Sequence, residues 1–304
     1  MVAIIIPYYK FTYFEDTLYS LASQTDKRFK VYIGDDASPE DCTSLLQRFE
    51  GQFDFEYHRF EDNLGGTSLT QQWERCIGLI DDNVFHWLMI LCDDDVMSEN
   101  CIAEFYVNLP NIIESDTKVV RFATKINDMG QNGLSPLYTH PILERSADFF
   151  YRRFTNQTRS SLSEYVFKKS SYLKYGFHNY NLAWYADDRA WLEFSEFKYI
   201  YTINSCYVIF RLSHENISRS GYKILEKQQV TYMFFKFVIN DYFYKFKRHQ
   251  QEKILLYFEQ LVYKNSKASF YFWLSHFFLF LISFHFIQSI KFTKRFLIHL
   301  NKDA

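Results

Sequence analysis

The amino-acid sequence predicts an α/β protein with a mostly parallel central sheet, followed by an α-helical C-terminal region. Short apolar runs alternate with helical periodicity over the first hundred residues, a pattern typical of βαβ units. Residues 222–304 instead show only long, aromatic helical stretches. The formal net charge also changes, from −10 in residues 1–222 to +8 in residues 223–304. We therefore expect two domains, residues 1–220 and 221–304.

The composition limits the class of protein. A chain of 304 residues that is 48% hydrophobic and 23% charged is expected to be globular rather than disordered or fibrous. Its five cysteines form no C-x-x-C pair, so neither a zinc ribbon nor a disulfide framework is expected. The first residues carry no basic stretch or small-residue cleavage site, so we expect a cytoplasmic protein without a signal peptide.

Six apolar runs are predicted to form strands. The first, residues 2–6, contains only aliphatic residues and ends at Pro7. The fourth, residues 86–91, runs directly into three aspartates. The remaining runs cover residues 29–33, 53–60, 119–126 and 164–167.

Helices are predicted between and after these strands. Residues 12–23 show an amphipathic pattern, and Thr12 and Glu15 have the spacing of a capping box. A second helix is expected to start at Ser38, because a capping hydroxyl is followed there by Pro39 and two acidic residues. Further helices are expected at residues 67–80, 146–154, 168–175 and 187–197.

Acidic residues follow two of the predicted strands. Asp35 and Asp36 come after the second strand, and Asp93, Asp94 and Asp95 come after the fourth. Both groups should therefore lie at the carboxyl edge of the parallel sheet, where open α/β sheets bind ligands. Consecutive carboxylates repel one another unless a divalent cation neutralises them, so we predict a Mg²⁺ or Mn²⁺ site. A solvated acidic turn, or helix capping by the first pair, is the alternative.

Six segments, taken in order, resemble elements of the family 2 nucleotide-sugar glycosyltransferases, whose nucleotide-binding fold is called GT-A. The resemblance covers roughly residues 2–220. The matching segments are Ile4-Ile5-Ile6-Pro7-Tyr8-Tyr9, Gly34-Asp35-Asp36-Ala37-Ser38, Asn63-Leu64-Gly65, Leu91-Cys92-Asp93-Asp94-Asp95, Ala186-Asp187-Asp188-Arg189-Ala190-Trp191-Leu192 and Phe210-Arg211-Leu212-Ser213-His214. The chain departs from the family pattern at several positions, with Lys10 for an Asn, Thr70-Gln71 for an Arg-Asn pair, Cys92 for an Asp and Ala186 for a Glu.

The resemblance implies a metal-dependent, inverting sugar transfer from a UDP- or TDP-type donor. Asp187 would be the catalytic base, with Asp188 as the alternative. The nucleotide would be bound by Pro7, Tyr9, Asp36 and Asp93, where Tyr9 stacks on the base ring and Asp36 accepts a hydrogen bond from its N3–H. The Mn²⁺ or Mg²⁺ ion would be held by Asp94, Asp95 and His214.

The C-terminal region is predicted to associate with a membrane. Residues 270–290 carry no charged side chain, which is just long enough for a helix to span a bilayer. Phe292, Phe296, Leu297 and Leu300 are expected on one helical face beside basic residues, as in a helix lying on an anionic membrane. We expect monotopic attachment to the cytoplasmic face. A buried helical subdomain or a homo-oligomer interface is the alternative.

The expected acceptor is a hydroxyl of a glycan or a lipid-linked carrier in cell-surface polysaccharide synthesis, and no nucleic-acid partner is expected. Two other classes of protein compete with this interpretation. A sugar nucleotidyltransferase or pyrophosphorylase also combines carboxylates with Mg²⁺, but it needs a glycine-rich basic phosphate loop, which Pro7-Tyr8-Tyr9-Lys10 is not. The second is a non-catalytic glycan-binding or membrane scaffold protein with the same fold.

Overall fold

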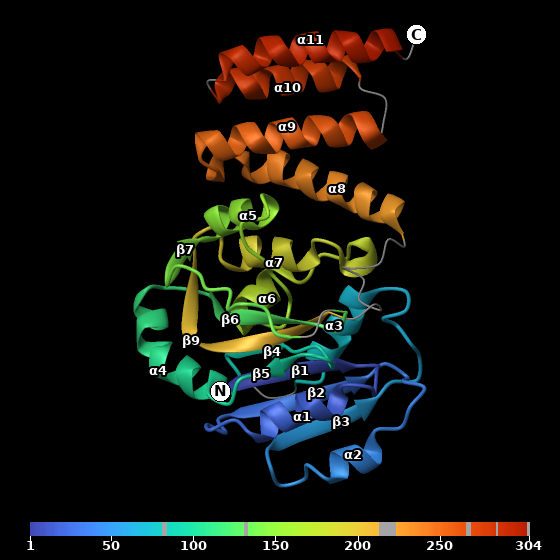
Figure 1. Cartoon of the computed structure of the whole chain (residues 1–304), viewed down its shortest axis with the longest axis vertical. Helices are drawn as coiled ribbons and strands as arrows, with labels where there is room; N and C mark the ends of the chain where they lie inside the picture. Colours follow the sequence, from blue (N-terminus) through green and yellow to red (C-terminus); the bar gives the residue numbers. More distant parts are fainter. Residues whose placement is uncertain (81–83, 131–132, 213–222, 266–268, 284, 303–304) are drawn as a thin grey trace. The chain divides into compact units, whose positions relative to one another are not determined.

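The computed structural model describes residues 1–80, 84–130, 133–212, 223–265, 269–283 and 285–302 (Figure 1). The chain divides into two compact units, Met1–Tyr222 and Lys223–Ala304. Within the described part of the first unit, nine strands form one sheet in the order β3-β2-β1-β4-β8-β6-β9-β5, and β7 pairs with β9. The fold class is therefore the predicted one.

The first half of the sheet is parallel. It consists of β1 (Val2–Tyr8), β2 (Phe29–Asp35), β3 (Asp54–Arg59) and β4 (Trp87–Ile90). Pro7 does not end β1 as predicted, since it lies within the strand opposite Gly34. Because Tyr8 pairs with Asp35 and Ile5 with Ile90, the residues after β1, β2 and β4 meet at one edge of the sheet.

The second half of the sheet mixes directions. Strand β8 (Tyr165–Lys168) is antiparallel to both β4 and β6 (Val119–Asp128). Strand β9 (Tyr199–Leu212) runs parallel to β6 and antiparallel to β5 (Val96–Met97) and β7 (Leu143–Arg145). Strand β9 lies near the C-terminal end of the first unit, and its last residues lie close to Asp95, which follows β4.

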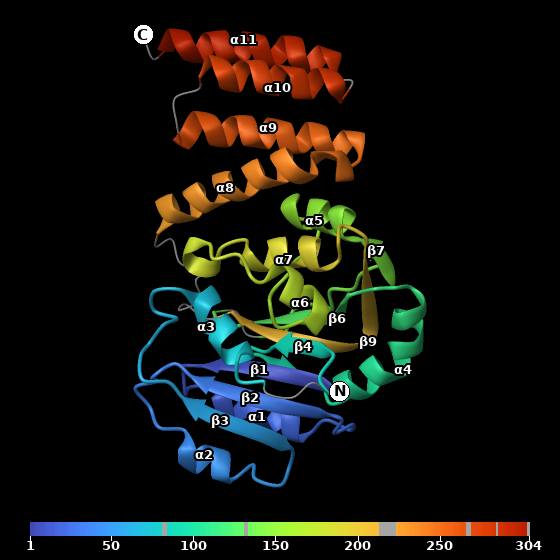
Figure 2. The same ribbon diagram turned by 180° about the vertical axis from the view of Figure 1, so that it is seen from behind.

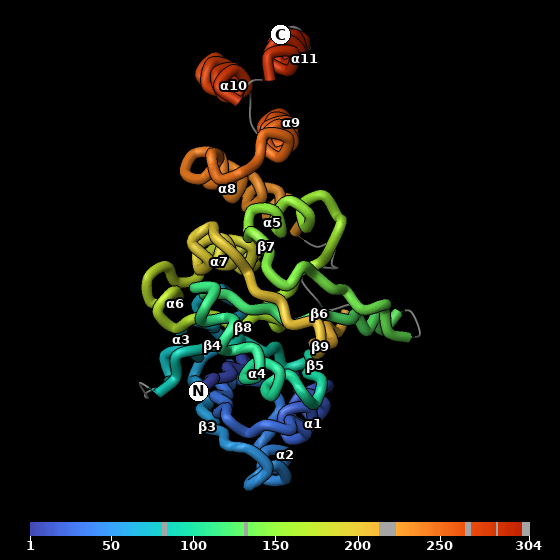
Figure 3. Tube along the Cα trace, turned by 90° about the vertical axis from the view of Figure 1, so that its left-hand side faces the viewer, coloured from blue at the N-terminus to red at the C-terminus, as the bar shows by residue number. Residues whose placement is uncertain are grey.

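Helices cover both faces of the sheet (Figures 1 and 2). Alternate residues of β1 point to opposite faces, so Ile4 packs with α1 (Phe14–Ala22), α2 (Thr43–Gln47) and α4 (Cys101–Glu114). Ile5 belongs to a second core with α3 (Leu69–Ile77), α5 (Ser146–Phe154), α6 (Lys169–Tyr175) and α7 (Ala186–Phe194). Figure 3 shows α2 and α7 on opposite sides of the strands.

Two predicted helix starts are wrong. Helix α1 begins at Phe14, and its N-cap Tyr13 makes no side-chain capping bond, so Thr12 and Glu15 form no capping box. Helix α2 begins at Thr43 instead of after Ser38. The Ser38 hydroxyl donates to the Tyr9 carbonyl at 2.8 Å, which joins the loops after β1 and β2 rather than starting a helix.

The second unit consists of helices in its described part. They are α8 (Ile224–Tyr242), α9 (Arg248–Asn265), α10 (Phe270–Ile282) and α11 (Phe286–Lys302). The uncharged run of residues 270–290 is thus divided between α10 and α11. Among the helices that can be described, none combines the length and the apolarity that a membrane crossing requires.

The predicted membrane-facing side of α11 is partly wrong. Phe292 and Phe296 are buried, because Phe292 packs with His276 and Phe296 packs with Trp273 of α10. The His276 ring nitrogen Nε2 lies 2.9 Å from the Leu255 carbonyl of α9. Leu297 is exposed as predicted. The other large apolar residues of this helix that are described as exposed are Phe286, Ile287, Ile290 and Ile298.

Candidate active site

The loop after β4 is tied to the loop after β1. The backbone amides of Tyr9 and Lys10 each donate to Oδ2 of Asp93 at 2.8 Å. The Thr17 hydroxyl of α1 lies 3.0 Å from the Asp93 carbonyl and 2.9 Å from that of Asp95. Asp93 therefore shapes the loop that carries Tyr9, whose side chain is exposed.

Asp94 and Asp95 lie in surroundings that disfavour two negative charges. Burial and the charges of Asp95 and Asp93 raise the pKa of Asp94 to about 8, and burial raises the pKa of Asp95 to about 6. The Asp95 side chain is fully buried, and its Oδ2 has no hydrogen-bond partner among the residues described. One oxygen from each carboxylate and the Cys92 sulfur lie within 4.8 Å of one another, so these side chains fit a divalent cation.

Arg211 of β9 holds this acidic loop in place. Its backbone amide donates to Oδ1 of Asp95 at 2.9 Å, and its Nε donates to the Asp94 carbonyl at 3.0 Å. The guanidinium also bonds to Asp16 of α1. His214, the third predicted metal ligand, lies outside the described residues, but the strand that precedes it ends beside Asp95.

Asp36 is fixed by the turn that follows β3. Its Oδ1 accepts from the Leu64 amide at 2.8 Å, and its Oδ2 accepts from the Gly65 amide at 2.9 Å. Arg75 of α3 forms an ion pair with Oδ1. Burial raises the pKa of Asp36, against the effects of these three donors. The Asp35 carboxylate accepts hydrogen bonds from a different set of donors, which are the Ser38 amide, the Tyr57 hydroxyl and the Arg59 guanidinium.

Gly65→Ala is expected to disrupt this turn. A Cβ at this position would lie 2.5 Å from Oδ2 of the buried Asp36, so the carboxylate or the turn must move. We expect a loss of about 1–3 kcal/mol in the free energy of unfolding, together with weaker nucleotide binding. Gly66→Ala is the matched control, because its Cβ would meet only the exposed Asn63 side chain at 3.0 Å. Chemical denaturation should separate the two variants, and equal stabilities would contradict the assigned role of Gly65.

Asp187 and Asp188 have different surroundings at the start of α7. Asp187 lines a cavity of about 250 Å³, whose other walls include Trp73, Trp184 and Phe210. Burial raises the pKa of Asp187, which favours proton acceptance. Asp188 is buried, and its Oδ1 lies 3.1 Å from Nε of Arg153. The geometry therefore favours Asp187 over Asp188 as the group that meets a substrate.

Residues 159–164 connect this cavity with the acidic loop. Ser160, Ser161 and Leu162 line the cavity, and the Ser163 hydroxyl accepts a hydrogen bond from the Cys92 amide at 3.0 Å. Burial raises the pKa of both Asp95 and Asp187, and the positive charge of Arg159 opposes that increase at both carboxyls. Residues 159–164 therefore lie next to both predicted parts of the site, which are the cavity lined by Asp187 and the loop that carries Asp94 and Asp95. Sequence reasoning missed Arg75, Arg159 and Ser163, because their partners are distant in the chain.

Known proteins support the assignment of the fold. The sequence matches the model of glycosyl transferase family 2 over residues 3–170. More than half of the chain is covered, and the chain belongs to this family. The predicted family and fold class are therefore confirmed. No curated protein sequence matches the chain significantly.

Solved structures with similar folds are distant in sequence. Staphylococcus aureus TarS has a TM-score of 0.60 and 14% identity over 87% of this chain, which spans 44% of TarS. A TarS 1–349 complex with UDP-GlcNAc has a TM-score of 0.60 and 14% identity, covering 88% of this chain and 74% of that one. GalNAc-T7 with UDP, GalNAc and Mn²⁺ has a TM-score of 0.51 and 11% identity, covering 76% and 47%. At these identities the likeness supports the fold alone.

Proposed function

We propose that the chain transfers a sugar from a UDP-type nucleotide donor to a glycan or lipid-linked hydroxyl, with inversion at the anomeric carbon and dependence on a divalent metal. The observation that carries the proposal is the cavity lined by Asp187, together with the segment that joins it to Asp94 and Asp95. UDP-GlcNAc is bound by TarS and UDP by GalNAc-T7. We propose that this chain likewise binds the uridine diphosphate part of its donor.

Each residue has a distinct task in the proposed reaction. Asp94, Asp95 and His214 would hold Mn²⁺ or Mg²⁺, which supplies positive charge for the leaving diphosphate. Asp187 accepts the proton of the acceptor hydroxyl as that oxygen attacks the anomeric carbon from the face opposite the diphosphate. Arg153 pairs with Asp188 and keeps positive charge beside Asp187. A single displacement of this kind inverts the anomeric configuration.

The nucleotide would lie at the edge where β1, β2 and β4 end. Tyr9, 37% exposed, is available to stack on the base, and Asp36 keeps its carboxylate oriented through the turn at Leu64 and Gly65. Pro7 lies within β1, two residues before Tyr9. The Asp93 carboxylate holds the same loop by accepting hydrogen bonds from the backbone amides of Tyr9 and Lys10. Trp73 and Trp184 provide aromatic cavity walls for an acceptor sugar.

The test is a donor screen with product analysis. The full chain is incubated with UDP- and TDP-sugars, Mn²⁺ and simple glycan acceptors, and the anomeric configuration of the product is read by NMR. Release of a nucleoside diphosphate with an inverted product supports the proposal. Formation of pyrophosphate from a sugar phosphate and a nucleoside triphosphate would favour a nucleotidyltransferase, and no turnover with any donor would favour a binding protein.

Metal binding is expected to strengthen as the pH rises. The metal-free carboxyls of Asp94 and Asp95 have raised pKa values of about 8 and 6, so protons compete with Mn²⁺ in this range. The folded state holds these protons more tightly than the unfolded chain, so its stability without metal should fall from about pH 4 to pH 8. Melting curves with and without Mn²⁺ measure both effects. A Mn²⁺ affinity that is constant between pH 6 and 8 would contradict them.

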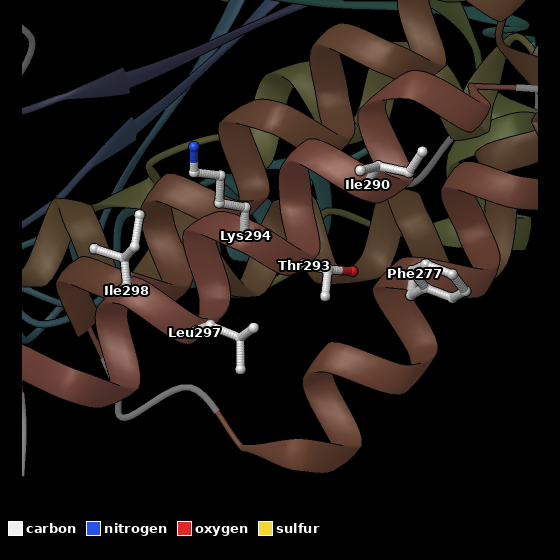
Figure 4. A pocket seen from close by; sticks show the side chains of 6 residues that line it. All are labelled: Phe277, Ile290, Thr293, Lys294, Leu297 and Ile298. Atoms are coloured by element: carbon white, nitrogen blue, oxygen red, sulfur yellow. The ribbon is translucent and has the colours of Figure 1, made fainter.

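We also propose that the second unit attaches to an anionic phospholipid surface on the cytoplasmic face of a membrane. Ile287 and Ile290 of α11 are 69% and 72% exposed, and Lys291 is exposed beside them. A groove of about 430 Å³ is lined by Phe277, Ile290, Thr293, Lys294, Leu297 and Ile298 (Figure 4). Apolar side chains flanked by lysines complement acyl chains and anionic headgroups together.

Vesicle sedimentation tests this attachment. The intact chain should bind anionic vesicles, partly reversibly with salt, and truncation near Gly221 should leave the first unit unbound. Ile290→Glu with Leu297→Glu should weaken binding by about tenfold or more, because two apolar side chains of roughly 1.5–3 kcal/mol each are lost from the contact. Val107→Glu changes an equally exposed apolar residue of α4 and is the control. If the intact chain does not bind anionic vesicles, the result would favour the alternative, a buried helical subdomain or a homo-oligomer interface.

A further inference from the structure

Cys92 lies close to Asp94 and Asp95, two of the proposed metal ligands. Its sulfur and one oxygen from each of Asp94 and Asp95 lie within 4.8 Å of one another. Metal–sulfur bonds of about 2.3 Å and metal–oxygen bonds of about 2.0–2.2 Å allow donor atoms to be roughly 4 Å apart around one ion. Only a small adjustment would therefore bring all three atoms into contact with the same cation.

Two further observations indicate that the site is arranged for a ligand. Asp95 is fully buried, and its Oδ2 lacks a hydrogen-bond partner within the described part of the chain, while Oδ1 is held by the Arg211 amide. The Cys92 backbone is fixed by the hydrogen bond from its amide to the Ser163 hydroxyl. Hydrogen bonds thus fix the side chain of Asp95 and the backbone of Cys92.

The position of Cys92 distinguishes it from the other cysteines. Cys42, Cys76, Cys101 and Cys206 are buried, whereas Cys92 is only partly buried. Cys101 and Cys206 are accounted for by packing and by local contacts, such as that of the Cys101 sulfur with the Tyr207 carbonyl. Within the described residues, Cys92 is the one cysteine whose thiol lies beside carboxylates that fit a metal.

We propose that Cys92 is a thiolate ligand of the divalent metal and sets the preference of the site. Thiolates favour thiophilic ions such as Zn²⁺ and Cd²⁺, whereas sites made only of oxygen suit Mg²⁺. When the metal–sulfur bond forms, the S–H bond breaks and its proton passes to water. The site therefore binds Zn²⁺, Cd²⁺ and Mn²⁺ in preference to Mg²⁺. The inference rests on the metal site of the proposed function.

The experiment is a titration of the full chain with Cd²⁺ or Co²⁺, followed by ultraviolet absorbance. A sulfur-to-metal charge-transfer band should grow to one equivalent in the wild-type chain and disappear in Cys92→Ser and Cys92→Asp. Cys101→Ser is the control and should keep the band. Competition titrations should show that the preference for Zn²⁺ over Mg²⁺ falls by about tenfold or more in Cys92→Asp.

Three outcomes would overturn the inference. Metal binding by the wild-type chain without a charge-transfer band, or a band that persists in Cys92→Ser, would remove the sulfur ligand while the carboxylate site of the proposed function stands. Absence of any metal binding by both the wild-type chain and Cys92→Asp would remove the metal site as well.

Discussion

Asp187→Asn is expected to lower the turnover number by about two to four orders of magnitude while nucleotide binding is retained. The amide has nearly the size of the carboxylate but cannot accept the proton of an acceptor hydroxyl. Asp187 lines the cavity, whereas the acidic loop that would bind the metal and diphosphate contacts Ser163, outside the cavity lining. Initial rates of sugar transfer and the dissociation constant for UDP with Mn²⁺ measure the two effects separately.

Asp188→Asn is the matched control for this prediction. Its carboxylate is buried against Arg153, so its loss should lower thermal stability more than the chemical step. An inactive Asp188→Asn with an active Asp187→Asn would show that the base is the next residue along the chain. Full activity of both variants would place the base elsewhere.

Asp94→Ala and Asp95→Ala should each abolish most of the Mn²⁺-dependent nucleotide binding. Each removes a charged oxygen ligand from a cluster of three donor atoms, and the unpartnered Oδ2 of Asp95 is lost in the second variant. Each change also removes a carboxylate, half-buried for Asp94 and buried for Asp95, whose surroundings disfavour its charge, so the fold should survive. Calorimetric titration with UDP in the presence of Mn²⁺ measures the loss.

His214→Ala should act in the same direction with a smaller effect, because a neutral ligand contributes less than a charged one. Removal of metal from the wild-type chain with EDTA should reproduce the Asp94→Ala result. Unchanged activity in EDTA, or in both aspartate variants, would exclude the metal mechanism.

The sequence allowed prediction of those parts of the site that depend on neighbouring residues. A buried strand followed directly by carboxylates places Asp36 and Asp94 at the carboxyl edge, because strand direction and side-chain alternation are local properties. The register of β1 with β2 and β4 agrees with that placement. Helix α5, Ser146–Phe154, has the predicted bounds.

The contacts that hold the site depend on packing between distant residues. Arg211 bonds to Asp95 across 116 residues, and Arg75 pairs with Asp36 across 39. Two of the missed elements have a structural reason. Strand β9 shifts register between its pairings of Ile203 with Phe122 and Tyr207 with Ala123, which interrupts the period-2 pattern. Helix α4 contains Pro110, which normally argues against a helix interior.

Cooperative binding of nucleotide and metal tests the central claim most directly. The melting temperature of the full chain is measured alone, with UDP, with Mn²⁺, and with both. Because a ligand that binds only the native state stabilises it by RT ln(1 + [L]/Kd), UDP at about 100 times its Kd should add about 2.7 kcal/mol. We expect this increase for UDP with Mn²⁺ and little or none for UDP with EDTA. An equal shift by UDP in Mn²⁺ and in EDTA, or no shift in either, would contradict a metal-dependent nucleotide-sugar site.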